Sequence, residues 1–197
     1  MKVSITGHSR GLGNALASVF TQHGHTVTGF SRANGYNINT IEGRLDILTQ
    51  ASDSDIFINN AYDPDGQFEM LEEIAAIWKD TDKLIINISS KGSLLSSTEQ
   101  STYDQDEFNK YISSKQKQNA LVRTRIFTAS PRLLNVIVGP IDTAFSDDCL
   151  LPTTDPIEHK LTPSSVANFI FDIVGYQKTI MVQEIVIDVP GVNWIAL

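Results

Sequence analysis

A tyrosine and a lysine lie four residues apart in a segment with helical periodicity. Tyr111 and Lys115 would therefore share one face of a helix expected over Asp106–Thr128. A tyrosine hydroxyl titrates near ~10, so it is a poor acid–base group unaided, and a nearby ammonium lowers that pKa by favouring the phenolate. Such a pair can exchange a proton with a carbonyl or alcohol oxygen. The alternative is a solvated helix surface, where a Tyr–Lys pair at this spacing is common.

Glycines gather in a second segment, directly after the first apolar run of the chain. Gly7, Gly11 and Gly13 follow Lys2–Thr6 and open a stretch with helical periodicity. Glycines let the backbone turn tightly and approach a diphosphate, and the helix start offers N–H groups and a positive dipole end to the anion. We therefore expect a dinucleotide-binding turn. The alternative is a plain strand–helix turn, in which glycine only caps the helix.

Short β-rich runs alternate with amphipathic helical runs along the chain. This alternation predicts one doubly wound α/β domain over residues 1–197, with a seven-stranded parallel sheet covered by helices on both faces. Ligands of such a fold bind at the carboxyl ends of the strands. Gly24 and Thr162 are expected to cap the first and last helices. Strands are expected over Lys2–Thr6, Thr26–Phe30, Tyr36–Ile38, Asp55–Asn59, Leu84–Ser89, Leu133–Val138 and Ile180–Ile187, and helices over Gly11–His23, Thr40–Ala51, Met70–Lys79, Asp106–Thr128 and Pro163–Val174.

Several motifs in this order resemble the short-chain dehydrogenase/reductase family, in its single-domain classical type. They are TGHSRGLG at 6–13, NNAY at 59–62, NISS at 87–90, YISSK at 111–115 and NVIVGPIDT at 135–143. The resemblance extends over nearly the whole chain. It implies a Rossmann-type domain that binds a nicotinamide cofactor.

The resemblance also implies catalytic roles for three residues. Tyr111 would donate or accept the proton, Lys115 would hold the nicotinamide ribose, and Ser90 would position the substrate oxygen. Matching NISS to the family's N-I-S-S selects Ser90, whereas the glycine usual three residues after the serine, here Gly92, would select Ser89. Because side chains alternate along a strand, only one of the two serines can face the site.

The helix before the fifth strand departs from the family pattern. Asn60 precedes Ser90 by only 30 residues, and Glu69–Lys79 contains no asparagine, although the family often places one there in a proton relay. Another group or water would complete the relay, or the site works without it. This departure favours one alternative function, a nucleotide-sensing or scaffold protein that does little chemistry.

The end of the second strand indicates which nicotinamide cofactor is used. No acidic residue stands there to bind a ribose 2′-OH; Ser31 and Arg32 stand there instead, and Arg10 lies in the glycine turn. Guanidinium groups suit a 2′-phosphate, so we expect NADP, although either arginine alone could be a solvated surface residue. Asn37 and Ile38 stand where the family often has Asp-Val beside the adenine, so the resemblance assigns them to the cofactor. The resemblance further assigns to the cofactor Gly7, Ser9, Gly11, Leu12, Gly13, Asn59, Asn60, Ala61, Ile141 and Thr143, besides Tyr111 and Lys115.

Composition limits the possible partners. Fifteen Lys and Arg stand against 23 Asp and Glu, a net charge of −8, which disfavours a nucleic-acid or anionic-membrane binder. No apolar run is long enough to span a bilayer, and because the first residues lack the apolar h-region of a signal peptide, we expect no secretory leader. The single cysteine, Cys149, excludes an internal disulfide and is consistent with the cytoplasm. His23 and His25 lack nearby carboxylate or thiol partners, so we expect no metal site.

These observations predict an NADP-dependent oxidoreductase that interconverts a carbonyl and an alcohol by hydride transfer. The partner is a small carbonyl or alcohol substrate, and the family is usually dimeric or tetrameric. A nicotinamide-dependent epimerase or dehydratase is the other alternative. Relatives of that kind usually carry a separate substrate portion, for which 197 residues leave little room.

Overall fold

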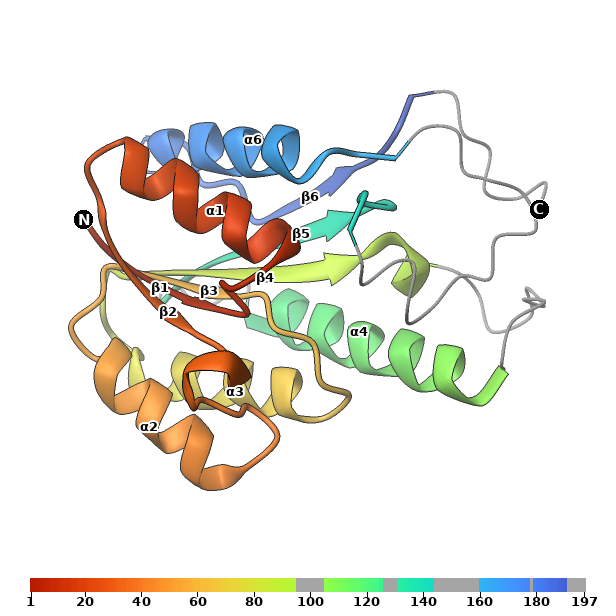
Figure 1. Ribbon diagram of the computed structural model, residues 1–197, viewed down its shortest axis with the longest axis horizontal. Helices are drawn as coiled ribbons and strands as arrows, with labels where there is room; N and C mark the ends of the chain where they lie inside the picture. Colours follow the sequence, from red (N-terminus) through yellow and green to blue (C-terminus); the bar gives the residue numbers. More distant parts are fainter. Residues whose placement is uncertain (95–104, 126–130, 144–159, 178, 191–197) are drawn as a thin grey trace.

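The computed structural model describes residues 1–94, 105–125, 131–143, 160–177 and 179–190. Within these residues six parallel strands form one sheet in the order β2-β1-β3-β4-β5-β6, with helices on both faces (Figure 1). The strands are β1 (Lys2–Thr6), β2 (Thr26–Phe30), β3 (Ile56–Asn59), β4 (Leu84–Ser90), β5 (Arg132–Val138) and β6 (Glu184–Ile187). The helices are α1 (Gly11–Gln22), α2 (Ile41–Ala51), α3 (Gly66–Ile77), α4 (Gln105–Arg125) and α6 (Pro163–Tyr176), with 3₁₀ turns η1 (Arg32–Asn34) and η2 (Lys91–Leu94). The predicted doubly wound α/β architecture is therefore confirmed.

Two apolar layers hold the sheet between the helices. The central strands are apolar on both faces, as strands covered on both sides must be; Ile58, for example, pairs with Ile5 and with Ile86. On one face α1 and α6 pack on the sheet, and on the other α2, α3 and α4 do so (Figure 1). Phe20 is buried in the first layer and Trp78 in the second. All strands point the same way, so their carboxyl ends share one edge of the sheet.

Helix caps follow the sequence closely. Thr40 and Thr162 each accept a hydrogen bond from a backbone N–H in the first turn of α2 and α6. Gly24 follows α1 in the left-handed conformation, at φ +78°, and its N–H donates to the Thr21 carbonyl at 3.0 Å. The expected caps at Thr162 and Gly24 are confirmed.

The third strand expected from the sequence does not form. Residues 36–38 are a loop, so the described sheet has six strands and not seven. Local hydrogen bonds take the backbone groups that a strand would use: the Tyr36 N–H donates to the Ser31 carbonyl at 2.9 Å, and the Asn37 side chain accepts from the Asn39 N–H at 3.1 Å. Side chains of this type offer the backbone an alternative to sheet pairing.

Helix α3 begins four residues before the expected start at Met70. Asp63 stabilises the first turn of α3, because its side chain accepts a hydrogen bond from the Gly66 N–H at 2.9 Å. Gly66 packs directly on the Ile38 carbonyl oxygen, from which an added Cβ would lie only 2.5 Å. The earlier start brings Gln67 into the helix, under the ends of β3 and β4.

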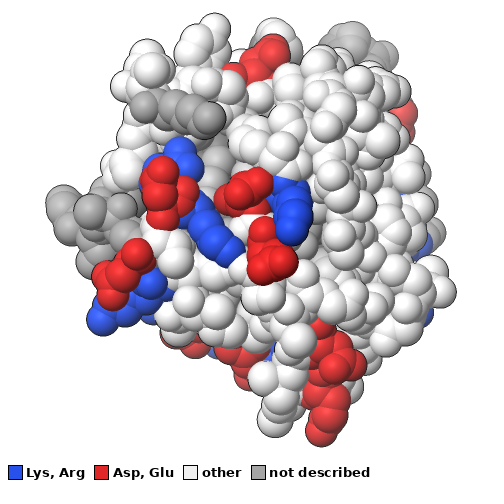
Figure 2. Space-filling model, turned by 90° about the vertical axis from the view of Figure 1, so that its left-hand side faces the viewer, with Lys and Arg blue, Asp and Glu red and all other residues white. Residues whose placement is uncertain are grey.

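Charged side chains of both signs gather at the amino ends of the strands, on the face shown in Figure 2. Lys2 pairs with Asp53 at 3.5 Å, and Arg132 with Asp82 at 3.0 Å. The Lys2–Asp53 pair is exposed at both side chains and contributes little to stability, whereas the Arg132 side chain is only 19% exposed. No described helix is long and apolar enough to cross a membrane.

Candidate active site

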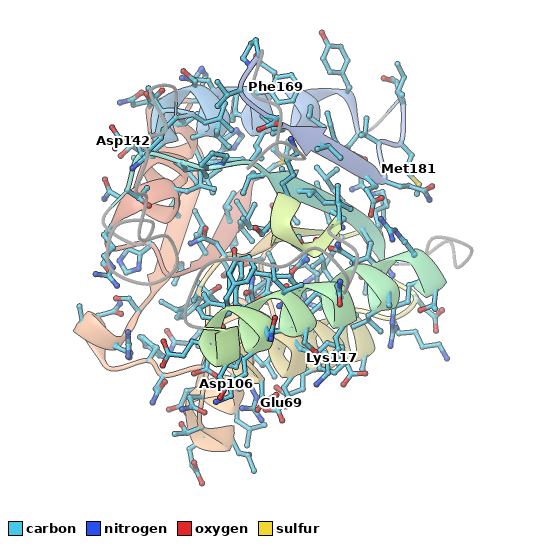
Figure 3. All side chains as sticks on the ribbon, turned by 90° about the vertical axis from the view of Figure 1, so that its right-hand side faces the viewer. Glu69, Asp106, Lys117, Asp142, Phe169 and Met181 are labelled. Carbon is cyan, nitrogen blue, oxygen red and sulfur yellow. The ribbon has the colours of Figure 1, made fainter. Side chains whose placement is uncertain are left out.

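Ser90, Tyr111 and Lys115 come together at the carboxyl edge of the sheet. The Ser90 and Tyr111 side chains share a hydrogen bond. The Lys115 ammonium lies 5.7 Å from the centre of the Tyr111 ring, one helical turn along α4. Figure 3 looks onto this edge: α4, marked by Asp106 and Lys117, crosses below the sheet, and Asp142 marks the segment after β5.

The strand register separates the two serines of the NISS motif. Strand β4 extends through Ser90, whose hydroxyl accepts from the Gly92 N–H at 3.3 Å. Ser89 points to the other face and is 2% exposed, and its hydroxyl has no hydrogen-bond partner among the described residues. The structure thus places Ser90, and not Ser89, beside the tyrosine.

Burial is the main cause of the shifted pKa values of Tyr111 and Lys115. It raises the pKa of Tyr111 to about 12, against the opposing effect of the hydrogen bond with Ser90. Burial lowers the pKa of Lys115 to about 7, because a charged ammonium loses its water. A substantial fraction of Lys115 is therefore neutral at pH 7, and protonation of this lysine favours the Tyr111 phenolate.

Two residues that the sequence analysis did not single out complete this cluster. The side-chain oxygen of Gln67, Oε1, accepts from the Lys115 ammonium at 2.6 Å. The Tyr62 ring lies edge-on to Tyr111, with ring centres 5.0 Å apart, and 5.6 Å from the ammonium. No spacing signal indicates either contact, since both residues come from the segment between β3 and β4 whose path depends on the start of α3.

Glycines shape the backbone of the turn before α1. Gly7 and Gly11 have left-handed φ values of +72° and +54°. An added Cβ on Gly13 would lie 2.1 Å from the Gly7 carbonyl oxygen, so only glycine fits. Arg10 precedes α1 without a side-chain capping bond, and the first turn of α1 has no acidic residue. The first N–H groups of the helix thus face no competing anion from the helix itself.

Residues from distant segments surround this turn. Asn60 donates through its side chain to the Thr6 carbonyl at 3.0 Å, and the backbone N–H groups of Asn60 and Ala61 both donate to the Thr6 hydroxyl. The methyl group of Thr143 lies 3.2 Å from the position of a Cβ on Gly11. The predicted cofactor positions in three segments therefore border one another.

The loop after β2 carries the predicted 2′-phosphate residues. The Ser31 hydroxyl and N–H both donate to the Asn34 side-chain oxygen, at 3.0 and 2.7 Å. Arg32 is exposed in η1, and Arg10 is exposed in the glycine turn. Gly29 leaves room for the ring of His8, which a Cβ there would approach to 2.1 Å. The sequence analysis missed this pairing of a large residue with a glycine.

Not every predicted cofactor residue offers its side chain to a ligand. Asn59 is fully buried, and its side-chain nitrogen donates to the backbone carbonyl of Gln67 and to the side-chain oxygen of Asn87. Ile38 is also buried, and Leu12 packs in the core. The structure thus gives these side chains a place in the protein interior. Ser9 lies exposed in the turn, and Ile141 forms a bridge with Leu161.

Three solved structures illustrate what the chain is similar to. A 3-alpha-hydroxysteroid dehydrogenase from Pseudomonas sp. B-0831, complexed with NADH, is 17% identical at a TM-score of 0.72, covering 95% of each chain. An alcohol dehydrogenase from the archaeon Thermococcus sibiricus, complexed with 5-hydroxy-NADP, is 19% identical at a TM-score of 0.70, covering 95% of this chain and 96% of that one. A short chain dehydrogenase from Burkholderia cenocepacia J2315, in complex with NADP, is 19% identical at a TM-score of 0.72, covering 94% of this chain and 86% of that one.

At the level of sequence, no family model and no curated protein matches the chain. The similarity to the solved structures shows that the chain has the fold of the short-chain dehydrogenases/reductases, as its motifs predicted, at low sequence identity.

Proposed function

We propose that this chain is a short-chain dehydrogenase/reductase that interconverts a carbonyl and an alcohol with a nicotinamide cofactor. The observation that carries the proposal is the hydrogen bond between Ser90 and Tyr111, with the Lys115 ammonium 5.7 Å from the tyrosine ring. This is an acid–base group, an orienting hydroxyl and a tuning cation at the edge of the sheet where the fold binds ligands.

The residues of the glycine turn suit such a cofactor. Gly13 packs so closely against the Gly7 carbonyl that no side chain fits there. The backbone at the start of α1 is therefore not covered by a side chain at this position, and its N–H groups could donate to a diphosphate. When bound, the cofactor supplies or accepts the hydride. Thr143 and the Asn60–Ala61 segment would border it, because both lie against the same turn.

The chain's own residues handle the proton and the substrate oxygen. Tyr111 gives its hydroxyl proton to the carbonyl oxygen in reduction, or takes the alcohol proton in oxidation. Ser90 donates a hydrogen bond that holds the same substrate oxygen. Lys115, when protonated, lowers the pKa of Tyr111 from its raised value and so brings the tyrosine closer to working pH.

The proposed cofactor is NADP. No carboxylate stands at the end of β2, where Ser31 and Arg32 lie, and Arg10 is exposed in the adjoining turn. A planar guanidinium binds a phosphate through two parallel hydrogen bonds, whereas a free ribose 2′-OH favours a carboxylate.

The test combines cofactor binding with turnover. NADPH and NADH are titrated by fluorescence, and then aldehydes, ketones and quinones are screened by NADPH absorbance. We expect NADPH binding, turnover of at least one carbonyl compound, and roughly a hundredfold or greater loss of turnover in Tyr111→Phe with cofactor affinity kept. The exposed Tyr176→Phe is the matched control. Binding without turnover would favour the nucleotide-sensing alternative, and wild-type turnover in Tyr111→Phe would exclude the mechanism.

A further inference from the structure

The side chain of Gln67 is fully buried beneath the ends of β3 and β4, and all its hydrogen-bonding capacity is used. Its nitrogen donates to the carbonyl oxygens of Asn59 and Ile88, at 3.0 and 3.1 Å. Its oxygen accepts from Lys115 at 2.6 Å and from Gln118 at 3.4 Å. An amide has two N–H donors and two acceptor sites, so this arrangement fixes which way the group faces. The oxygen must face the lysine.

The environment of Lys115 explains why that oxygen matters. The lysine is 4% exposed, and its ammonium donates to two uncharged oxygens, those of Gln67 and the Ile88 carbonyl. Within the part of the chain that the structure describes, the titratable groups that face it are Tyr62 and Tyr111, with ring centres 5.6 and 5.7 Å away. No carboxylate forms an ion pair with it among the described residues. A buried ammonium without such acceptors would lose its proton.

We infer that Gln67 is the positioning residue of this site: its carbonyl oxygen holds the Lys115 ammonium beside Tyr111 without neutralising it. A carboxylate in the same place would bind the ammonium more strongly, but it would cancel the field that the lysine exerts on the tyrosine hydroxyl. An amide satisfies the buried cation and does not oppose its charge, so the lysine acts on Tyr111 whenever it is protonated. The role of this field in catalysis rests on the proposed function, whereas the hold on Lys115 does not.

Two substitutions separate these effects. Gln67→Met keeps the length of the side chain and removes the acceptor, so the charged form of Lys115 is less favourable and its pKa falls. Gln67→Glu is nearly isosteric and places a negative charge 2.6 Å from the ammonium in the native geometry, so the pKa of Lys115 rises. The two variants therefore move the same titration in opposite directions.

The experiment follows the Lys115 titration by NMR of protein carrying ¹³C at the lysine ε-carbon, with the signal identified by its loss in Lys115→Met. We expect the midpoint, about pH 7 in the parent protein, to fall by about one to two pH units in Gln67→Met and to rise by a similar amount in Gln67→Glu. Gln177→Met is the control, because Gln177 is a buried amide whose nitrogen donates to the Val182 carbonyl, away from the site. It should leave the midpoint unchanged.

A purely structural role for Gln67 would lower the melting temperature of Gln67→Met but leave its Lys115 midpoint at that of the parent protein, and that result overturns the inference. If Gln67→Met does not fold, an unmoved midpoint in Gln67→Glu overturns the inference, because the side chain at position 67 would then not reach the ammonium. The titration uses neither substrate nor cofactor. A shifted midpoint in a protein that turns over no carbonyl compound therefore supports the role of Gln67 and contradicts the proposed function. Turnover of a carbonyl compound with an unmoved midpoint supports the proposed function and contradicts the role of Gln67.

Discussion

At the scale of single residues, the two adjacent serines have opposite surroundings. Ser90 bonds to Tyr111, whereas Ser89 is buried on the other side of β4. We expect Ser90→Ala to lower kcat by roughly tenfold or more, because an oriented donor to the substrate oxygen is lost. Ser89→Ala should leave kcat near that of the parent protein, since its hydroxyl has no described partner to lose. Steady-state kinetics of both variants gives the comparison, and the reverse ranking would reassign the catalytic serine.

The proposed preference for NADP also rests on single residues. Arg32→Asp removes a cation that would pair with the 2′-phosphate and adds a carboxylate that repels it. A hydrogen bond to a charged group contributes about 1.5–3 kcal/mol, so NADPH should bind roughly tenfold to a hundredfold more weakly, while NADH gains relative to it. Added salt should weaken NADPH binding more than NADH binding. Fluorescence titration of both cofactors measures this, and equal affinity of the parent protein for the two would disprove the 2′-phosphate site.

At the scale of elements, one row of buried amides ties the central strands together. Asn59, Asn87 and Asn135 lie in register on β3, β4 and β5, and each donates to the next, with Asn87 and Asn135 joined at 2.9 Å. Asn135 then donates to Asn119 of α4 and to Glu184 of β6, at 2.9 and 3.0 Å. Because buried amides are costly unless paired, this row fixes the register of the strands that carry the site.

The carboxylate at the end of this row predicts a pH dependence. Burial alone would raise the pKa of Glu184, but hydrogen bonds from Arg123 and Asn135 and the charge of Arg123 lower it overall. Because the pKa of Glu184 is lower in the folded protein than in the unfolded chain, its ionised form stabilises the fold at pH values above the unfolded pKa. This contribution disappears as the pH falls through the pKa of the folded protein. Glu184→Gln should therefore destabilise the protein at pH 7 and progressively less below about pH 4.5.

Urea unfolding at several pH values measures that difference in the free energy of unfolding. Glu72→Gln, on the exposed side of α3, is the matched control for loss of one carboxylate. Because Arg123 is half exposed, the effect should shrink in high salt. A destabilisation that is constant from pH 7 to pH 3 would show that the ionised form of Glu184 contributes nothing.

At the scale of the whole molecule, the glycine turn, the Asn60–Ala61 segment and Thr143 meet at one edge although they lie far apart in the chain. A ligand that binds there holds β1, β3 and the segment after β5 together, so it stabilises the fold as a unit. At a hundredfold excess over Kd, NADPH should add about 2.7 kcal/mol. For a domain of this size that corresponds to a rise in Tm of roughly 5–10 °C.

Differential scanning fluorimetry with and without NADPH tests this expectation. Gly13→Ala should abolish the rise, because its Cβ would meet the Gly7 carbonyl oxygen at 2.1 Å. Gly175→Ala is the control, since a Cβ on that helical glycine meets nothing within 4 Å. A rise in Tm retained by Gly13→Ala would place the cofactor elsewhere.

The sequence by itself determined the features that depend on local pattern. Alternating apolar runs predicted the parallel sheet and its helices, Thr162 and Gly24 predicted helix ends, and the four-residue spacing placed Tyr111 and Lys115 on one face of α4. These predictions hold because periodicity and capping act within a few residues of the chain. The same reasoning was wrong for residues 36–38, which form a loop, because a hydrogen bond to the Asn37 side chain takes a backbone N–H group there.

Only the tertiary structure decided which side chains meet. The register of β4 turned Ser90 toward Tyr111 and buried Ser89, which motif spacing had left open. The early start of α3 placed Gln67 against Lys115, 48 residues away in the chain. Contacts of this kind depend on where a helix begins relative to distant strands. That position is set by packing, such as Gly66 against the Ile38 carbonyl, and not by any pattern within the helix.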